Sequence, residues 1–322
     1  MNRIFAIGIC LLLVGCSGQK EESGLKFTDQ QRSVPSFNAD SAYAFVKQQV
    51  ELGPRIPNTK PHREAKNYFE QKLQSYAGSN SVFAQNFTVE GYEGEALKLS
   101  NIIAAFNTSS TDRIMLCAHW DTRAVSDEDS VAADQSFPGA DDGGSGVAVL
   151  LELARLLSEN PPPVGVDIVL FDGEDYGKSG DLRNYFLGSR YWADNPPVPG
   201  YSPRFGILVD MVGATNATFP KEGYSMNYAP NLVDEIWDIA EKKGYRDLFL
   251  SKRGSSIQDD HVIINQQTNI PMVDIINHKS RDANAGVFPD HWHTQGDNMN
   301  VIDKKTLKAV GEVLAELIYN RI

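Results

Sequence analysis

The feature that most constrains the fold is a regular alternation of apolar runs and helical patterns over the last two thirds of the chain. Short, nearly continuous apolar runs predict strands, and apolar residues at helical spacing predict the helices between them. Strands with so few polar positions are typical of a sheet that is covered on both faces. The pattern therefore predicts an α/β fold with a mixed, mostly parallel central sheet and helices on both faces. The predicted strands are 113–118, 166–171, 206–212 and 271–276, and the predicted helices are 146–157, 229–243 and 303–322.

The residues before this alternation predict two helices followed by a hairpin. Amphipathic helices are expected at 38–50 and 61–73, and strands at 81–89 and 97–106 are expected at the sheet edge. No linker rich in Pro, Gly or Ser divides the chain after residue 40. We therefore expect one domain over residues 38–322, preceded by a tether and N-terminal extension over 16–37.

Residues 1–15 have the pattern of an export signal. A single positive charge at Arg3 precedes an apolar run over 4–14, which is shorter than the roughly 20 residues that a membrane-spanning helix needs. The run ends in Leu-Val-Gly followed by Cys16, which resembles a bacterial lipoprotein signal, in which the chain is cut before the cysteine and the cysteine is acylated. We expect a protein that is anchored to the bacterial cell envelope, on its periplasmic or surface side, through lipid on Cys16. An ordinary signal peptide is the alternative.

The charge of the chain disfavours nucleic-acid binding, and its cysteine content disfavours a disulfide or a catalytic thiol. The chain has 30 Lys and Arg against 42 Asp and Glu, a net charge of −12, so it repels phosphate backbones and no nucleic-acid partner is expected. Cys10 and Cys16 belong to the signal and the anchor, so the folded domain keeps Cys117 alone and has no internal disulfide. Cys117 lies in an apolar strand and is expected to be a core residue, not a catalytic thiol.

Polar residues follow the predicted strands at the point where each strand ends. His119 and Asp121 follow 113–118, the segment 172–175 follows 166–171, Asp210 lies within 206–212, and the pair 277–278 follows 271–276. In open α/β sheets, ligands bind outside the carboxyl ends of the strands, so these groups are expected to meet in one crevice. Loops at 139–144 and 291–294 add more carboxylates and imidazoles, and this donor set without a thiol suits Zn²⁺.

Seven short segments together resemble the zinc-dependent aminopeptidase and glutaminyl cyclase superfamily over nearly all of residues 38–322. Each is weak alone, but their order is specific to the superfamily, and the last three are closer to the animal-type and bacterial zinc glutaminyl cyclases. They are Ala-His-Trp-Asp at 118–121, Gly-Ala-Asp-Asp at 139–142, Phe-Asp-Gly-Glu-Asp at 171–175, Leu-Gly-Ser-Arg at 187–190, Val-Asp-Met-Val-Gly at 209–213, Asp-Asp-His at 259–261 and Trp-His-Thr at 292–294.

The resemblance implies a metal site with three protein ligands. Asp141, Asp175 and His293 match the zinc ligands of the family, which leaves an open position for substrate. The family usually has Glu where this chain has Asp175, so the shorter side chain requires a closer approach of its loop or weakens the ligation. The resemblance also implies a cis peptide bond between Asp141 and Asp142. His291 competes with His293 as the imidazole ligand.

The resemblance also implies the catalytic residues. Glu174 matches the general acid and base, Asp210 and Asp259 match a hydrogen-bonded carboxylate pair, and Trp292 is expected to form a wall of the substrate pocket. Asp121 is expected to orient His119.

The implied reaction is the conversion of the N-terminal Gln of a peptide or protein to pyroglutamate with release of ammonia, with one Zn²⁺ per chain. The alternative is a two-zinc aminopeptidase, in which His119 and Asp210 bind a second zinc. A non-catalytic binding lipoprotein on the same scaffold is a third possibility that the intact Glu174 disfavours.

Other polar residues have simpler interpretations. Asp172 is expected to be a helix cap or turn residue, and His62, His261 and His278 are expected to be structural or on the surface. The acidic residues Asp127, Glu128, Asp129 and Asp134 are expected to form a solvated loop, since they lack the spacing of a calcium site.

Overall fold

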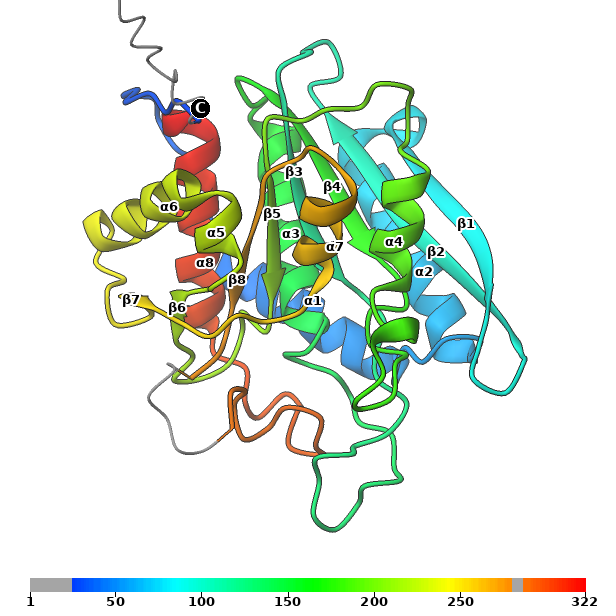
Figure 1. The fold of residues 1–322 in the computed structure, drawn as a ribbon. Helices are drawn as coiled ribbons and strands as arrows, with labels where there is room; N and C mark the ends of the chain where they lie inside the picture. The colour runs from blue at the N-terminus through cyan, green and yellow to red at the C-terminus, as the bar shows by residue number, and fades with distance from the viewer. Residues whose placement is uncertain (1–24, 280–285) are drawn as a thin grey trace, which may run out of the picture.

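A six-stranded sheet forms the centre of the fold in the computed structural model, which describes residues 25–279 and 286–322 (Figure 1). Its strand order is β1-β2-β4-β3-β5-β8, in which β4, β3, β5 and β8 are parallel and β1 and β2 form an antiparallel hairpin at one edge. The predicted mixed, mostly parallel α/β sheet is confirmed. The bounds are β1 Val82–Glu90, β2 Ala96–Phe106, β3 Arg113–His119, β4 Gly165–Phe171, β5 Gly206–Asp210 and β8 Met272–Ile276.

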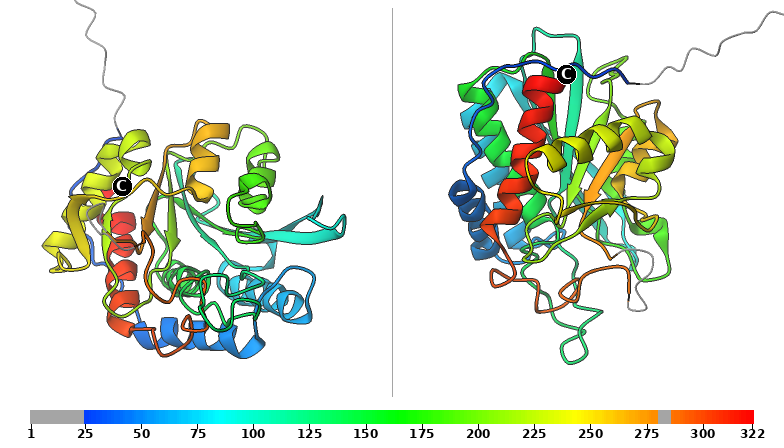
Figure 2. Two further views of the ribbon diagram at one scale, coloured as in Figure 1. Left: turned by 60° about the horizontal axis from the view of Figure 1, so that its bottom comes forward. Right: turned by 90° about the vertical axis from the view of Figure 1, so that its left-hand side faces the viewer.

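Helices cover both faces of this sheet (Figure 2). One face carries α1 (Ala39–Leu52), α2 (Lys60–Ala77), α3 (Gly144–Glu159) and α8 (Lys304–Glu316), which enclose the larger hydrophobic core. The other face carries α4 (Leu187–Asp194) and α7 (Asp260–Gln267), which close a smaller core around Cys117 and Trp192. Cys117 is fully buried there, in accord with its expected core position.

A smaller lobe lies beyond β8 (Figure 1). It contains a parallel pair of short strands and two helices, of which the longer contacts α8. These elements are β6 Phe219–Lys221, α5 Ser225–Tyr228, α6 Pro230–Lys242 and β7 Phe249–Arg253. The remaining short segments are the 3-10 turns η1 Ser79–Ser81 and η2 Leu182–Asn184 and the π-helical end η3 Leu317–Arg321.

Local sequence signals explain where the first two helices begin. The side chain of Asn38 accepts hydrogen bonds from the first turn of α1, and Thr59 does the same for α2, which has Pro at its first turn. Gly53 and Gly78 follow the two helices with positive φ angles of 99° and 83°, a conformation that glycine adopts without steric cost.

Residues 25–37 extend along the C-terminal end of the chain. The backbone N–H groups of Thr28 and Gln30 donate to the carbonyl oxygens of Arg321 and Asn320, both at 2.8 Å. The predicted signal peptide and Cys16 lie outside the described residues. Within 25–279 and 286–322, no helix is both long and apolar enough to cross a membrane.

Candidate active site

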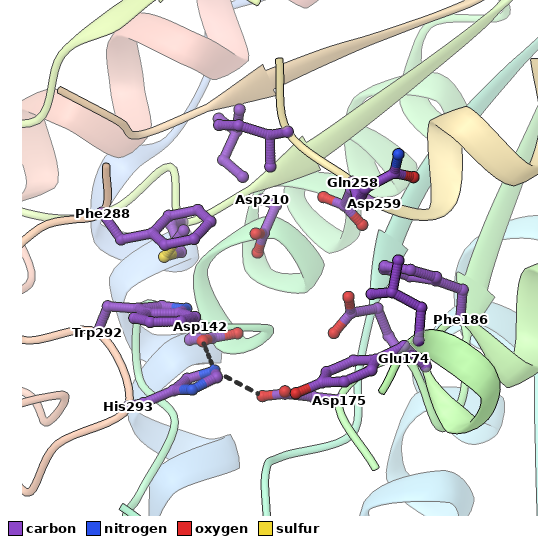
Figure 3. Close-up of a pocket in the computed structure, with 15 residues that line it drawn as sticks. Asp142, Glu174, Asp175, Phe186, Asp210, Gln258, Asp259, Phe288, Trp292 and His293 are labelled. Atoms are coloured by element: carbon purple, nitrogen blue, oxygen red, sulfur yellow. Dashed lines mark ion pairs between the residues drawn. The ribbon is translucent and has the colours of Figure 1, made fainter. Parts of the chain in front are cut away.

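A cavity opens at the carboxyl ends of the central strands, as the sequence predicts (Figure 3). Its floor carries acidic side chains from the loop before α3, the loop after β4, the end of β5 and the start of α7. Aromatic and aliphatic side chains form its walls. The acidic residues are Asp142, Glu174, Asp175, Asp210 and Asp259, and the apolar lining includes Tyr185, Phe186, Met211, Ile257, Phe288 and Trp292.

Asp142, Asp175 and His293 form a group that fits a metal ion. Each offers one ligand atom, and the three atoms lie within 4.8 Å of one another. His293 Nε2 lies 3.2 Å from Asp175 Oδ2 and 3.6 Å from Asp142 Oδ2, the two contacts drawn in Figure 3. Asp175 Oδ2 is buried and accepts no hydrogen bond from any residue that the structure describes. Two carboxylates and one imidazole are donors that Zn²⁺ prefers, and they leave a coordination position for substrate.

The electrostatics of this group favour a positive charge. Burial alone would lower the pKa of His293, but the neighbouring carboxylates of Asp175 and Asp127 raise it to about 10. The same carboxylates that attract a proton to this imidazole attract a metal cation to the group. The donor set, the buried carboxylate oxygen without a donor and the local charge therefore all fit a divalent cation.

The structure corrects the predicted ligand Asp141. Its Oδ1 accepts a hydrogen bond of 2.8 Å from the backbone N–H of Gly213, and its Oδ2 lies 2.9 Å from His291 Nε2. Asp141 is thus committed to fixing its loop, while the next side chain, Asp142, points toward His293. His291 contacts Asp141 and is not a member of any group of possible metal ligands among the described residues. The predicted cis bond between Asp141 and Asp142 is also wrong, because the described residues contain no cis peptide bond.

Asp297 and Arg55 hold the loop that carries Asp142. Both oxygens of Asp297 accept backbone N–H groups, from Asp141 at 2.7 Å and from Asp142 at 3.1 Å. The buried Arg55 donates to four carbonyl oxygens, those of Trp120 at 2.8 Å, Pro138 at 3.0 Å, Gly139 at 2.7 Å and Asp142 at 3.5 Å.

Asp127 holds His293 from its other side, a role that the sequence did not indicate. Asp127 is only partly exposed, and its Oδ1 lies 3.2 Å from His293 Nδ1. Arg123 donates to both oxygens of Asp127 and also lies 3.3 Å from Asp175 Oδ1. A carboxylate that accepts the second N–H of a ligating imidazole fixes its tautomer and orientation. The prediction of a purely solvated acidic loop is therefore wrong for Asp127.

A second group of possible ligands shares Asp142. His119 Nε2 lies 3.0 Å from Asp142 Oδ1 and 3.2 Å from Asp210 Oδ1. Burial raises the pKa of Asp210 to about 6, in spite of the imidazole beside it. These are the residues that the aminopeptidase alternative requires for a second zinc.

Glu174 lies beside the metal group without belonging to it. The backbone N–H groups of Glu174 and Asp175 donate to the two oxygens of Asp121, at 3.0 and 3.1 Å, which fixes the backbone that carries both side chains. Asp121 also lies 3.5 Å from His119 Nδ1, so it contacts the residue that it was expected to orient. Burial, together with the charges of Asp175 and Asp259, raises the pKa of Glu174 well above its usual range, although His119 opposes this. A carboxyl group of this kind can accept and return a proton near neutral pH.

Asp259 caps α7 and faces the cavity near Glu174 (Figure 3). Burial, together with the charges of Asp210 and Asp260, raises the pKa of Asp259 well above its usual range. The structure thus brings Glu174, Asp210 and Asp259 to one cavity.

Trp292 and its neighbours form an aromatic wall. The ring of Trp292 stacks on His293 at a centroid distance of 3.7 Å and on Phe288 at 4.3 Å. Phe186, Met211 and His293 all line the cavity and have positive φ angles of 60°, 49° and 52°. Such backbone conformations are costly for residues with side chains and persist where the surrounding structure enforces them, most often at functional sites.

Two sets of residues after the strands do not reach the cavity. Asn277 accepts a hydrogen bond from the backbone N–H of Thr218, and His278 Nδ1 donates to the carbonyl oxygen of Ile276 at 2.9 Å. Asp172 does not have the expected role of a helix cap or turn residue. Its buried carboxylate lies 2.9 Å from His62 Nε2 and accepts a hydrogen bond of 2.6 Å from the backbone N–H of Ser100.

The model of peptidase family M28 matches residues 101–318. The matched range includes the metal group and every acidic residue of the cavity. This chain belongs to peptidase family M28. The predicted zinc aminopeptidase and glutaminyl cyclase superfamily is confirmed.

Solved structures of M28 proteins align with nearly the whole chain. A glutaminyl cyclase of Bacteroides thetaiotaomicron, bound to N-acetylhistamine, is 45% identical, with 89% of this chain and 99% of that chain covered and a TM-score of 0.85. The glutaminyl cyclase of Porphyromonas gingivalis is 47% identical, with 87% and 97% covered and a TM-score of 0.83. The glutaminyl-peptide cyclotransferase of Bos taurus is 26% identical over 298 residues, which cover 81% of this chain and 76% of that protein.

Some M28 relatives have names from the aminopeptidase branch. A structure described as a leucine aminopeptidase precursor of Bacteroides thetaiotaomicron is also 45% identical, with 89% and 99% covered and a TM-score of 0.84. The two kinds of name correspond to the two reactions considered from the sequence.

Proposed function

We propose that this M28 protein is a zinc-dependent glutaminyl-peptide cyclotransferase, which converts the N-terminal Gln of peptides to pyroglutamate and ammonia. The observation that carries the proposal is the position of Glu174, a partly buried carboxyl group that lines the cavity beside a metal group that it does not join. The cyclase relatives, which align with nearly the whole chain, support the same reaction.

Asp142, Asp175 and His293 would hold one Zn²⁺. When bound, the ion supplies a Lewis acid for the carbonyl oxygen of the Gln side-chain amide. Arg123 and Asp127 keep Asp175 and His293 in place, and Asp297 keeps Asp142 in place.

Glu174 moves the proton that the reaction requires. The α-ammonium group of the substrate first loses one proton to solvent. Glu174 then accepts a proton from the neutral α-amine as its nitrogen forms a bond to the amide carbon of the Gln side chain. The bond from that carbon to the amide nitrogen breaks, and Glu174 returns the proton to the departing ammonia. A raised pKa suits both steps, because the group must be a base first and an acid afterwards.

The cavity suits a peptide amino terminus. Its acidic floor attracts the positively charged α-amine, and Asp210 and Asp259 can accept hydrogen bonds from it. Trp292 and Phe288 can pack against the apolar part of the Gln side chain. Water is not a reactant in this cyclisation, so an apolar wall favours it over hydrolysis.

Replacement of Glu174 by Gln tests the proposal. Purified wild-type protein is expected to release ammonia from Gln-initiated peptides without cutting a peptide bond, and Glu174→Gln is expected to lower turnover about 10²- to 10⁴-fold, the usual contribution of general acid–base catalysis. Zinc content should not change, since Glu174 is not in the metal group. Glu128→Gln, at an exposed carboxylate, is the matched control.

His119→Ala separates the cyclase from the aminopeptidase. A one-zinc cyclase keeps its metal content in this variant, whereas a two-zinc aminopeptidase loses one ion and most of its hydrolysis. Release of free Leu from Leu-initiated peptides by wild-type protein, together with a bound zinc that His119→Ala removes, would overturn the proposal.

We also propose that the protein is exported and anchored to the cell envelope by lipid on Cys16, on the lipoprotein-like pattern of residues 1–16. Cys16→Ser is expected to move the protein from the membrane fraction to the soluble fraction. Continued membrane association of this variant would contradict the proposal.

A further inference from the structure

A second set of buried acidic residues lies behind Asp259, on the side of the cavity away from His293. We call it the inner cluster. It brings together the segment after β6, the start of α7 and the middle of β8. Its members are Glu222, Asp259, His261 and Asp274, and each is at most 3% exposed.

Three members of the inner cluster offer ligand atoms to one point. One atom each of Asp259, His261 and Asp274 lies within 4.8 Å of the others. His261 Nδ1 lies 3.7 Å from Asp274 Oδ2, which is too long for a hydrogen bond. The two atoms therefore face each other without a direct bond.

The atoms of Asp274 and His261 that can face this point have no hydrogen-bond partner among the residues that the structure describes. Neither oxygen of Asp274 accepts a hydrogen bond within residues 25–279 and 286–322, and His261 Nδ1 has no partner there either. Over the same residues, no lysine or arginine pairs with a carboxylate of the inner cluster. Burial, together with the charges of Asp259 and Asp210, raises the pKa of Asp274 well above its usual range. A buried carboxylate in this state requires either a proton or a cation.

Glu222 determines which nitrogen of His261 faces the point. Its carboxylate accepts from the backbone N–H groups of Tyr224, Ser225 and Ile257, three donors that favour its ionised form. Its Oε2 lies 3.1 Å from His261 Nε2, which donates to it. Nδ1 is then the nitrogen with a free lone pair, directed at Asp274.

This arrangement repeats that of the metal group in the cavity. Each has two aspartates and one histidine, and in each a further carboxylate accepts the second N–H of the imidazole, Asp127 for His293 and Glu222 for His261. A histidine held in this way by a carboxylate is characteristic of metal ligands in proteins.

We propose that Asp259, His261 and Asp274 bind a second divalent cation of the Zn²⁺ class. Two carboxylates and an imidazole favour zinc and similar transition metals over Ca²⁺ or Mg²⁺, which prefer oxygen donors. Because Asp259 also lines the cavity, the ion can enter from there, and a water molecule can complete its coordination. The site differs from the group of His119, Asp142 and Asp210 and does not depend on the proposed reaction.

The test measures zinc bound to the chain without substrate. In the double variant His119→Ala/His293→Ala, both groups that contain Asp142 have lost their imidazole. After removal of metal with a chelator and titration with Zn²⁺, this variant is expected to retain one tightly bound ion per chain. Adding Asp274→Asn, which keeps the size of the side chain, is expected to abolish that binding. Asp260→Asn is the matched control, because Asp260 is equally buried but is not in the group.

Crystals of wild-type protein soaked in Zn²⁺ give a second measurement that does not depend on the folding of a triple variant. An anomalous peak among Asp259, His261 and Asp274 is the expected result. No peak there, or a double variant that binds no zinc, would show that the inner cluster shares protons instead and would overturn the proposal. Equal zinc binding with and without Asp274→Asn would overturn it as well.

Discussion

Asp127→Asn tests how far the metal group depends on residues that do not touch the metal. In the wild type, Asp127 accepts from His293 Nδ1 at 3.2 Å and from Arg123, which also contacts Asp175. An asparagine at this position can still accept from Arg123 through its carbonyl oxygen. In Asp127, however, Oδ1 contacts both His293 Nδ1 and Arg123 Nε, and Oδ2 accepts from Arg123 Nη2. The amide has one acceptor oxygen and no charge, so in either orientation an N–H donor faces His293 or Arg123 and the charge-assisted contact with His293 is lost.

The expected loss follows from the loss of this one contact. Removing the partner of a ligating histidine typically weakens metal binding about 10- to 100-fold. This corresponds to about 1.4 to 2.7 kcal/mol, since each tenfold change in Kd is about 1.4 kcal/mol. The Kd for Zn²⁺ should therefore rise by one to two orders of magnitude, and activity should recover when zinc is supplied in excess.

Competition with a chromophoric chelator measures the Kd, and Asp134→Asn is the control. Asp134 belongs to the same loop and is exposed, so both variants remove one negative charge and only Asp127→Asn removes a contact with His293. If the two variants bind zinc equally, the effect is one of net charge and the assigned role of Asp127 is wrong.

Two further substitutions test the stability of the regions behind the site. Glu222→Gln should lower the free energy of unfolding by about 3 kcal/mol at pH 7, because the pKa of Glu222 is about 2 in the folded protein against 4.5 ordinarily. That contribution is present above pH 4.5 and is lost as the pH falls toward 2. Urea unfolding at pH 3 should therefore show a difference of only about 1.4 kcal/mol between the unfolding free energies of the wild type and the variant. An equal difference at pH 7 and pH 3 would contradict this prediction. Arg55→Lys should lower the free energy of unfolding by about 3 kcal/mol and reduce zinc occupancy, because one ammonium group cannot reach the four carbonyl oxygens that accept from Arg55. Unchanged thermal unfolding and metal content would refute this.

The main elements of the fold could be predicted because their patterns are long and local. All six strands of the central sheet and helices α1, α2, α3, α6 and α8 lie where the sequence places them. The missed elements are short or misleading. Residues 262–264 of α7 are three consecutive β-branched residues, a pattern typical of a strand, and they are helical here because they pack against α4 and β8. The strands β6 and β7 are short and pair with each other outside the main sheet, so no longer pattern marks them.

The group of side chains that fits a metal ion differs from the predicted ligand set by one residue, and the difference has a physical cause. Asp141 and Asp142 are adjacent, and the side chains of adjacent residues point in different directions. The choice between them depends on which one finds a backbone donor, and the donor for Asp141 is Gly213, far along the chain. Asp127 was missed for the same reason, since its partner His293 is 166 residues away and nothing local marks the contact.

The aspartate at position 175 shows how the fold compensates for a shorter ligand. The family usually has the longer glutamate there, so the loop after β4 must bring the carboxylate closer to the metal group. Asp121 provides this, because its two oxygens accept from the backbone N–H groups of Glu174 and Asp175 and draw the loop toward β3. Arg123 then contacts Asp175 Oδ1, which leaves Oδ2 directed at His293 Nε2, 3.2 Å away. The same two hydrogen bonds that position Asp175 also fix the backbone of Glu174, so the geometry of the proposed ligand and of the proposed proton carrier depends on one buried carboxylate, Asp121.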